Sequence, residues 1–214
     1  MSKIAVIDYD AGNTMSVMNA LKFLGYDTVL SRDENVIRKA DRVIFPGVGA
    51  YADAMEKLKG YNLINVIKEV VAEGTPFLGI CLGMQLLFDY STENAQDFGK
   101  DRIEGLGILK GGISGFKENP MFSGEKVPHM GWNSLEFCSE GSRLFKGIPN
   151  GSFVYFVHSF YLAAENRSDV AATCNYGISF DAAVEKGNVF GCQFHPEKSG
   201  DTGMAILRNF CEMT

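Results

Sequence analysis

The sequence predicts an α/β protein with a doubly wound, mostly parallel sheet and helices on both faces. Short apolar runs alternate with segments of helical spacing through roughly the first hundred residues, which is typical of strands joined by helical crossovers. Each run is apolar throughout, as expected for strands that are covered on both faces. From about residue 105, Gly-rich and aromatic segments separated by short turns predict an antiparallel extension.

The elements of the first half follow in order. "KIAVIDY" (3–9) predicts a strand that ends in the turn "DAGN", before a helix that Gly25 closes. Next come the strand "YDTVLS" (26–31), a short polar helix and the strand "RVIFP" (42–46). After a Gly-rich loop, helical spacing over 63–71 predicts a helix that Gly74 stops, and "PFLGI" (76–80) predicts the next strand.

The second half predicts further strands of the same sheet and an added antiparallel ribbon. These strands are "GISGF", "SLEFC", "GSFVYFVHSFYLA", "DVAATCNY" and "NVFGCQF". "TGMAILRNFCEM" (202–213) predicts a closing amphipathic helix. Because no internal repeat or Pro-rich linker divides the chain, we expect one domain over residues 1–214.

Composition excludes several classes of protein. Hydrophobic residues make up 46% of the chain and charged residues 21%, which is the ordinary balance of a globular protein. The net charge of −6 and the lack of basic runs argue against nucleic acid as a partner. No apolar stretch approaches the ~20 residues that span a bilayer, and the start lacks a signal-peptide pattern, so we expect a cytoplasmic protein that binds no membrane.

The five cysteines are scattered, odd in number and not paired at metal-ligand spacing. They predict free thiols, with neither a disulfide framework nor a zinc site. We therefore expect no metal and no cofactor.

Cys81 lies in "GICLG" (79–83), between a strand and an expected helix beginning in "MQLLF". The G-x-nucleophile-x-G form is typical of a sharp turn that lifts a nucleophile out of a sheet, and the glycines allow close approach of neighbouring backbone. A helix N-terminus beside the thiol favours the thiolate. The alternative is that the glycines serve strand–helix packing and that Cys81 fills the core, and this pentapeptide alone leaves both open.

A nucleophilic thiol needs a base, and His195 in "GCQFHPEKS" directly follows a predicted strand. Glu197 lies two residues further on, and residues i and i+2 of an extended segment point to the same side. The pair predicts a Cys-His-Glu relay; the alternative is a histidine in a turn beside a solvated glutamate. The occurrence of "HPE" together with the Cys81 turn favours the relay.

Three loops that follow strands are expected to converge, because functional loops gather at the carboxyl ends of parallel strands. They lie in "FPGVGAY" (45–51), "GICLGM" (79–84) and "FHPEKS" (194–199). The glycines of "PGVG" (46–49) allow backbone N–H groups to face an oxyanion, although the same residues also suit a simple tight turn.

These motifs resemble those of the class I (triad) glutamine amidotransferases, whose fold is flavodoxin-like. "IDYDAGN" (7–13), "VPHMGWN" (127–133) and "YFVHSF" (155–160) narrow the resemblance toward the glutaminase subunits of imidazole glycerol phosphate synthases, enzymes of histidine biosynthesis. The similarity spans the whole chain. It implies that Cys81 attacks the amide of glutamine to form a thioester, that His195 moves the protons and that Glu197 orients His195.

The resemblance also implies the contacts of the substrate. The backbone N–H groups of Leu82 and Gly49 would hold the oxyanion. The side chains of Gln85 and Glu93 would bind glutamine, with Glu93 pairing with its α-ammonium. The backbone of one strand segment would bind the α-carboxylate: His158, Ser159 and Phe160.

As its partner, the resemblance implies a (β/α)₈ cyclase subunit in a heterodimer, which uses the ammonia to make imidazole glycerol phosphate and aminoimidazole carboxamide ribotide. The sequence has no P-loop or barrel pattern of its own. The expected interface residues are Trp132, Tyr155, Lys198 and Asn13, although a lone tryptophan is also a common core residue. Asp10 departs from the family, which commonly has glycine there; we expect a changed loop, because Asp tolerates left-handed backbone.

Three alternatives remain. The chain could serve another ammonia-using synthase, such as one that amidates sugars of surface polysaccharides. It could be a stand-alone cysteine amidase or peptidase, which predicts a wide cleft. It could also be a non-catalytic binding module in which Cys81 is a packing residue.

Overall fold

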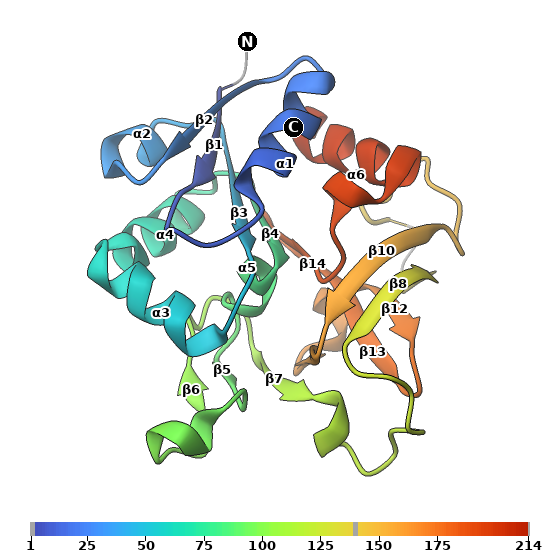
Figure 1. Ribbon diagram of the computed structural model, residues 1–214. Helices are drawn as coiled ribbons and strands as arrows, with labels where there is room; N and C mark the ends of the chain where they lie inside the picture. Colours follow the sequence, from blue (N-terminus) through green and yellow to red (C-terminus); the bar gives the residue numbers. More distant parts are fainter. Residues whose placement is uncertain (1–2, 139–140, 214) are drawn as a thin grey trace.

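A computed structural model describes residues 3–138 and 141–213, and it begins with a parallel sheet. Five strands lie side by side in the order β2, β1, β3, β4, β14, and every pair of neighbours is parallel (Figure 1). This is the order of a flavodoxin-like sheet. In chain order these strands are β1 (Lys3–Ile7), β2 (Asp27–Ser31), β3 (Arg42–Gly47), β4 (Phe77–Cys81) and β14 (Val189–Cys192).

Helices cover both faces of this sheet, and alternate residues of the strands point to one face or the other. In β1, Ile4 and Val6 belong to the core under α1 (Thr14–Phe23) and α6 (Gly200–Glu212). Ala5 and Ile7 belong to the core on the opposite face, under α2 (Glu34–Arg38), α3 (Tyr51–Gly60) and α4 (Leu63–Ala72). Figure 1 shows the two sets of helices on either side of the strands. The predicted doubly wound architecture is confirmed.

An antiparallel extension continues the sheet beyond β14, as the second half of the sequence predicts. The order runs β14, β13, β11, β7, β5, β6, and β12 and β9 continue from β13. The β13 segment was not among the predicted strands. The bounds are β5 (Tyr90–Ser91), β6 (Ile103–Glu104), β7 (Gly111–Gly115), β9 (Glu136–Phe137), β11 (Phe160–Ala164), β12 (Val170–Asn175) and β13 (Ser179–Lys186). Short 3₁₀ helices span Ala95–Phe98, Phe116–Glu118, Arg167–Asp169 and Pro196–Lys198.

The predicted antiparallel ribbon is formed by β8 (His129–Ser134) and β10 (Phe153–His158). Trp132 lies opposite Tyr155, and Met130 lies opposite Val157. Because side chains alternate along a strand, these four residues share one face of the ribbon. His129 and His158, which also lie opposite each other, share the inner face and are buried.

Two helices differ from the prediction. The segment after the Gly-rich loop forms α3, whose buried positions include the small residues Ala52 and Ala54, so its apolar periodicity is weak. The helix after Cys81, α5 (Leu82–Gln85), has only four residues; it includes Met84 and Gln85 of "MQLLF" but ends before the rest of that segment. A single turn still directs backbone N–H groups toward the thiol, but it lacks the dipole of a long helix.

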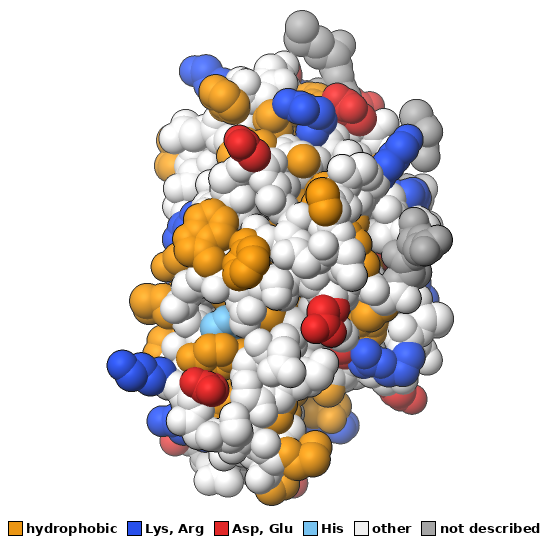
Figure 2. Space-filling view, turned by 90° about the vertical axis from the view of Figure 1, so that its right-hand side faces the viewer, with side chains coloured by type: hydrophobic (Ala, Val, Ile, Leu, Met, Phe, Trp, Pro, Cys, Tyr) orange, Lys and Arg blue, Asp and Glu red, His pale blue; other side chains and the backbone are white. Residues whose placement is uncertain are grey.

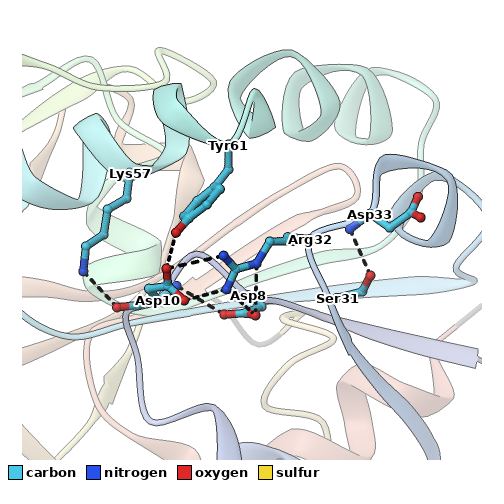
Figure 3. A network of polar contacts seen from close by, with 7 residues as sticks. All are labelled: Asp8, Asp10, Ser31, Arg32, Asp33, Lys57 and Tyr61. Atoms are coloured by element: carbon cyan, nitrogen blue, oxygen red, sulfur yellow. Dashed lines mark hydrogen bonds and ion pairs between the residues drawn. The ribbon is translucent and has the colours of Figure 1, made fainter.

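The loop after β1 is held by a network of charged groups around Asp10, whose φ is 58° (Figure 3). Arg32 contacts the carboxylates of both Asp8 and Asp10, at 2.6 and 2.5 Å. The Tyr61 hydroxyl donates to Asp10, and Lys57 Nζ donates to its carbonyl oxygen at 2.8 Å. The Arg32 guanidinium and the Tyr61 hydroxyl lower the pKa of Asp10. Asp10 has left-handed backbone, a conformation that aspartate tolerates, and its side chain contacts Arg32 and Tyr61.

Candidate active site

Cys81 is the last residue of β4 and has a backbone conformation that is rare for a non-glycine residue, with φ 54° and ψ −114°. The glycines on either side permit this turn. A Cβ on Gly83 would lie 1.8 Å from the carbonyl oxygen of Phe45, and a Cβ on Gly79 would lie 2.7 Å from the Cα of Met84. Since neither position has room for a side chain, the turn of the chain at Cys81 requires both glycines.

His195 follows β14, and its Nδ1 donates to Glu197 Oε1 at 2.9 Å. The two side chains are buried, with exposed fractions of 2% and 0%. The predicted contact is confirmed, but its predicted cause is wrong. Residues Pro196–Lys198 form a 3₁₀ turn rather than an extended segment, and this turn brings the carboxylate back onto the imidazole.

The position of the imidazole is fixed through the backbone of its own loop. The N–H of His195 donates to the carbonyl of Tyr155 at 2.9 Å, and Ser199 Oγ donates to the carbonyl of His195 at 2.6 Å. His195 Nε2 has no hydrogen-bond partner in the part of the chain that the structure describes. This nitrogen remains for the chemistry of the site.

The pKa of His195 is raised to about 10. Burial acts to lower it, but the neighbouring Cys81 thiolate and the Glu197 carboxylate stabilise the imidazolium and outweigh burial.

One cavity of about 370 Å³ joins the three loops that were expected to converge. It is within the range of pockets for small ligands, ~300–1,000 Å³. All of the residues predicted for the oxyanion and for glutamine line it. The complete lining is Val48, Gly49, Cys81, Leu82, Gln85, Glu93, Pro128, Val157, His158, Ser159, Phe160 and His195.

Glu93 supplies the negative charge of the cavity wall. Its Oε2 accepts a hydrogen bond from the backbone N–H of Tyr51, the first residue of α3, at 3.0 Å. Burial raises the pKa of Glu93, against the effect of this N–H. The carboxylate is therefore held in place and only partly solvated, which suits a cationic ligand group.

Two buried histidines lie behind the Phe160 wall of the cavity. His158 Nδ1 donates to the carbonyl of Phe160 at 2.8 Å, so its Nε2 is the acceptor for His129 Nδ1 at 2.9 Å. Burial lowers the pKa of His129 to about 4 and that of His158 to about 3. The pair is neutral and structural, so His158 contributes backbone rather than a base. His129 was not predicted as a site residue, although it lies in "VPHMGWN".

The sequence predicts Asn13 at an interface, but its side chain contacts Glu197. Its Nδ2 donates to Glu197 Oε1 at 3.4 Å. Asn13 precedes α1 and makes no side-chain capping bond to that helix. Asparagine at such a position usually caps, so the sequence alone gave no signal for this contact.

The other predicted interface residues gather on the outer face of the ribbon. Trp132 is 55% exposed, which excludes a core role, and its ring lies 6.1 Å from that of Tyr155 in an edge-on arrangement. Lys198 Nζ lies 6.0 Å from the Tyr155 ring centre. Met130 and Phe153 are also exposed. Figure 2 shows apolar side chains gathered on the side of the molecule that carries this ribbon.

Within residues 3–138 and 141–213, no group of three or more His, Cys, Asp or Glu side chains is arranged to hold a metal ion. Over the same residues, no helix has the length and apolar character to cross a membrane.

Comparisons with known proteins agree with this geometry. The model of the family described as glutamine amidotransferase class-I matches residues 5–213. "Imidazole glycerol phosphate synthase subunit HisH" of Moorella thermoacetica is 46% identical, over 100% of this chain and 96% of its own length. The protein of the same name from Geobacter sulfurreducens is 44% identical over the whole of both chains.

Solved structures show the same fold at lower identity. The structure of PurLQS from Thermotoga maritima matches with a TM-score of 0.73 at 20% identity, covering 99% of this chain and 98% of that one. A glutamine amidotransferase from the same organism matches with a TM-score of 0.64 at 19% identity, over 99% and 83% of the two chains. Because the family model and the relatives span nearly the whole chain, the chain belongs to the class I glutamine amidotransferases.

Proposed function

We propose that this chain is the glutaminase subunit of an imidazole glycerol phosphate synthase, with Cys81, His195 and Glu197 as its catalytic triad. The observation that carries the proposal is that a thiol on a strained turn lines the same small cavity as His195, whose imidazole is hydrogen-bonded to the buried Glu197. The 44–46% identity to named HisH subunits supports this choice within the family.

The reaction begins with the Cys81 thiolate, which attacks the side-chain carbonyl carbon of glutamine. A C–S bond forms, and the carbonyl electron pair moves to oxygen. Backbone N–H groups of Leu82 and of Gly49, which both line the cavity, are the proposed donors to this oxyanion. When the intermediate collapses, the C–N bond breaks, His195 Nε2 gives its proton to the leaving nitrogen, and ammonia departs.

The second half releases glutamate. His195, now neutral, takes a proton from water, whose oxygen attacks the thioester carbon. The C–S bond breaks, glutamate leaves and the thiolate returns. Glu197 holds the imidazole in the tautomer that presents Nε2 to the reaction and stabilises the imidazolium in each half.

The cavity is matched to a free amino acid. Glu93 is proposed to pair with the α-ammonium, and the backbone of Ser159 and Phe160 is proposed to bind the α-carboxylate; all three residues line the cavity. A peptidase would need room for chain on both sides of the scissile bond. A cavity of about 370 Å³ therefore favours glutamine over a polymeric substrate.

The proposed docking surface for the cyclase subunit is the outer face of the β8–β10 ribbon. It carries Met130, Trp132, Phe153, Tyr155 and Val157. Three of these are large apolar side chains with more than half of their surface exposed. Val157 also lines the catalytic cavity, so this face reaches the mouth through which ammonia would pass to a partner.

The test is glutamine hydrolysis by the purified chain, with and without the cyclase subunit of the same organism and a ligand for it. Cys81→Ala is the control. We expect weak basal hydrolysis that the liganded cyclase stimulates and that Cys81→Ala abolishes. Activity that depends on Cys81 but is indifferent to the cyclase would point instead to another synthase, such as a sugar-amidating one. A complete lack of Cys81-dependent hydrolysis would refute the glutaminase.

Two further predictions belong to this proposal. One domain over residues 1–214 is supported by a family model that runs across residues 5–213. A cytoplasmic location is supported by the free state of all five cysteines. Limited proteolysis tests the single domain, and cell fractionation tests the location.

A further inference from the structure

Gln193, which is not part of the proposed triad, contacts the sulfur of Cys81 through its polar side chain. Gln193 lies just after β14 and is fully buried. Its side-chain Nε2 donates to Cys81 Sγ at 3.6 Å, and its backbone N–H donates to the carbonyl of Ala182 at 2.9 Å. A backbone bond to β13 therefore anchors the residue whose amide faces the thiol.

The orientation of this amide follows from a chain of hydrogen bonds that starts at a carbonyl. The Phe160 carbonyl only accepts, so the amide end of Gln85 that lies 3.2 Å from it is the NH₂ group. The same NH₂ lies 2.9 Å from the side chain of Gln193, which must present its oxygen there. The other end of the Gln193 amide, which faces Cys81, is then the NH₂ group and donates to the sulfur.

We propose that Gln193 stabilises the Cys81 thiolate through its amide N–H and, through its amide oxygen, fixes which end of the Gln85 amide faces the glutamine site. An N–H donor favours the charged form of a sulfur acceptor, so the contact at Cys81 supports the nucleophile before substrate binds. The two N–H donors of the Gln85 amide are then occupied by the Phe160 carbonyl and by Gln193 Oε1. Gln85 Oε1 accepts no bond from the described residues, so it remains free to accept a hydrogen bond from the substrate. This second half rests on the proposed function.

The test compares Gln193→Met with the unaltered chain. Methionine has a similar length and volume but neither donates an N–H nor accepts as a carbonyl does. The measurement is the rate of Cys81 alkylation by iodoacetamide from pH 5 to 10, followed by mass spectrometry of the Cys81 peptide, with Cys81→Ala identifying the signal. The pH midpoint of this profile is read separately from its plateau. A change of access alters the plateau, whereas loss of a thiolate contact moves the midpoint.

Gln193→Met is expected to raise the midpoint of the alkylation profile by about one pH unit. Gln193→Asn, which keeps the amide but withdraws it by one methylene, is expected to shift the midpoint in the same direction. Phe190→Leu is the matched control, since it perturbs a buried residue of β14 outside the cavity lining, and its midpoint is expected to stay unchanged. If circular dichroism shows that Gln193→Met does not fold, the midpoint of Gln193→Asn decides the test.

Midpoints in Gln193→Met and Gln193→Asn that match the unaltered chain would overturn the proposal and make Gln193 a packing residue. In the cyclase complex, Gln193→Met is also expected to raise KM for glutamine several-fold, which reports on Gln85; an unchanged KM would overturn that half. The alkylation test needs no turnover. A shifted midpoint in a chain without glutaminase activity would therefore support the thiolate contact while refuting the proposed function.

Discussion

Asn13 and His195 meet on a single oxygen atom of Glu197. His195 Nδ1 lies 2.9 Å from Oε1, and Asn13 Nδ2 lies 3.4 Å from the same atom. The Glu197 carboxylate is therefore held between the loop that follows β1 and the turn that precedes α6. Its position depends on both segments.

Asn13→Ala is expected to lower kcat for glutamine hydrolysis about three- to tenfold, because Glu197 loses a donor that holds it against the imidazole. The melting temperature should hardly change, since Asn13 makes no side-chain capping bond to α1. Steady-state kinetics in the cyclase complex and calorimetry measure the two quantities. Asn19→Ala, on the exposed surface of the same helix, is the control. An unaltered kcat would show that Asn13 does not position Glu197 for catalysis.

Gly83→Ala is expected to destabilise the fold by about 3 kcal/mol or more and to abolish hydrolysis, because the added Cβ would lie 1.8 Å from a backbone oxygen that cannot rotate away. Urea denaturation gives the free energy of unfolding. Gly60→Ala is the matched control, as nothing lies within 4 Å of its Cβ and its φ is ordinary, and it should be neutral. Equal stability of the two variants would contradict the close approach of β3 to the nucleophile turn.

The stability of the protein is expected to fall below pH 6.5. His129 and His158 have folded-state pKa values of about 4 and about 3, below their ordinary value of 6.5. Their contribution is therefore complete above pH 6.5 and is lost as the pH falls, because only the unfolded chain takes up the protons. His195, whose pKa is raised, stays protonated in the folded chain, so its small contribution has the opposite sign and ends once the unfolded chain is protonated as well.

Denaturation at pH 6.5 and pH 5.0 should differ by about 2 kcal/mol for each of the two rings. His129→Gln keeps a donor toward His158 but removes one titrating ring, so its loss of stability over the same interval should be about half that of the unaltered chain. Equal losses in both proteins would mean that His129 is not held neutral.

Trp132→Ala is expected to weaken binding of the cyclase subunit by about 30-fold, or about 2 kcal/mol, since a large exposed aromatic side chain on an apolar face is a typical interface anchor. Isothermal titration calorimetry measures the affinity. Phe23→Ala serves as the control, because Phe23 is 83% exposed on α1, outside the ribbon. Similar affinities for the two variants would move the docking surface elsewhere.

The features that the sequence predicts well are local ones. Four of the parallel strands are mainly apolar runs, whereas the edge strand β2 carries Asp27, Thr28 and Ser31 and is not fully buried. The turn at Cys81 is identified by glycines two residues on either side of it. The contact between His195 and Glu197 was predicted for the wrong reason, because Pro196 starts a 3₁₀ turn. Helix α3 was missed since it packs through small residues, and β13 was missed because it carries charged residues among its apolar ones.

The features that the sequence does not predict join distant parts of the chain. Asn13 and Glu197 are 184 positions apart, and Gln85 and Gln193 are 108 apart. Polar side chains such as these have many possible partners along an unfolded chain. Only the packed sheet, which brings the ends of β1, β4 and β14 to one edge, selects these pairs.

The position of β14 has a consequence for synthesis of the protein. The last strand of the chain lies between β4 and β13, so it completes the middle of the sheet. Until residues 189–192 leave the ribosome, β4 has an open apolar edge, and His195 has not yet been made. A nascent or truncated chain is thus exposed to edge-to-edge association, and it cannot hydrolyse glutamine before its sheet is closed.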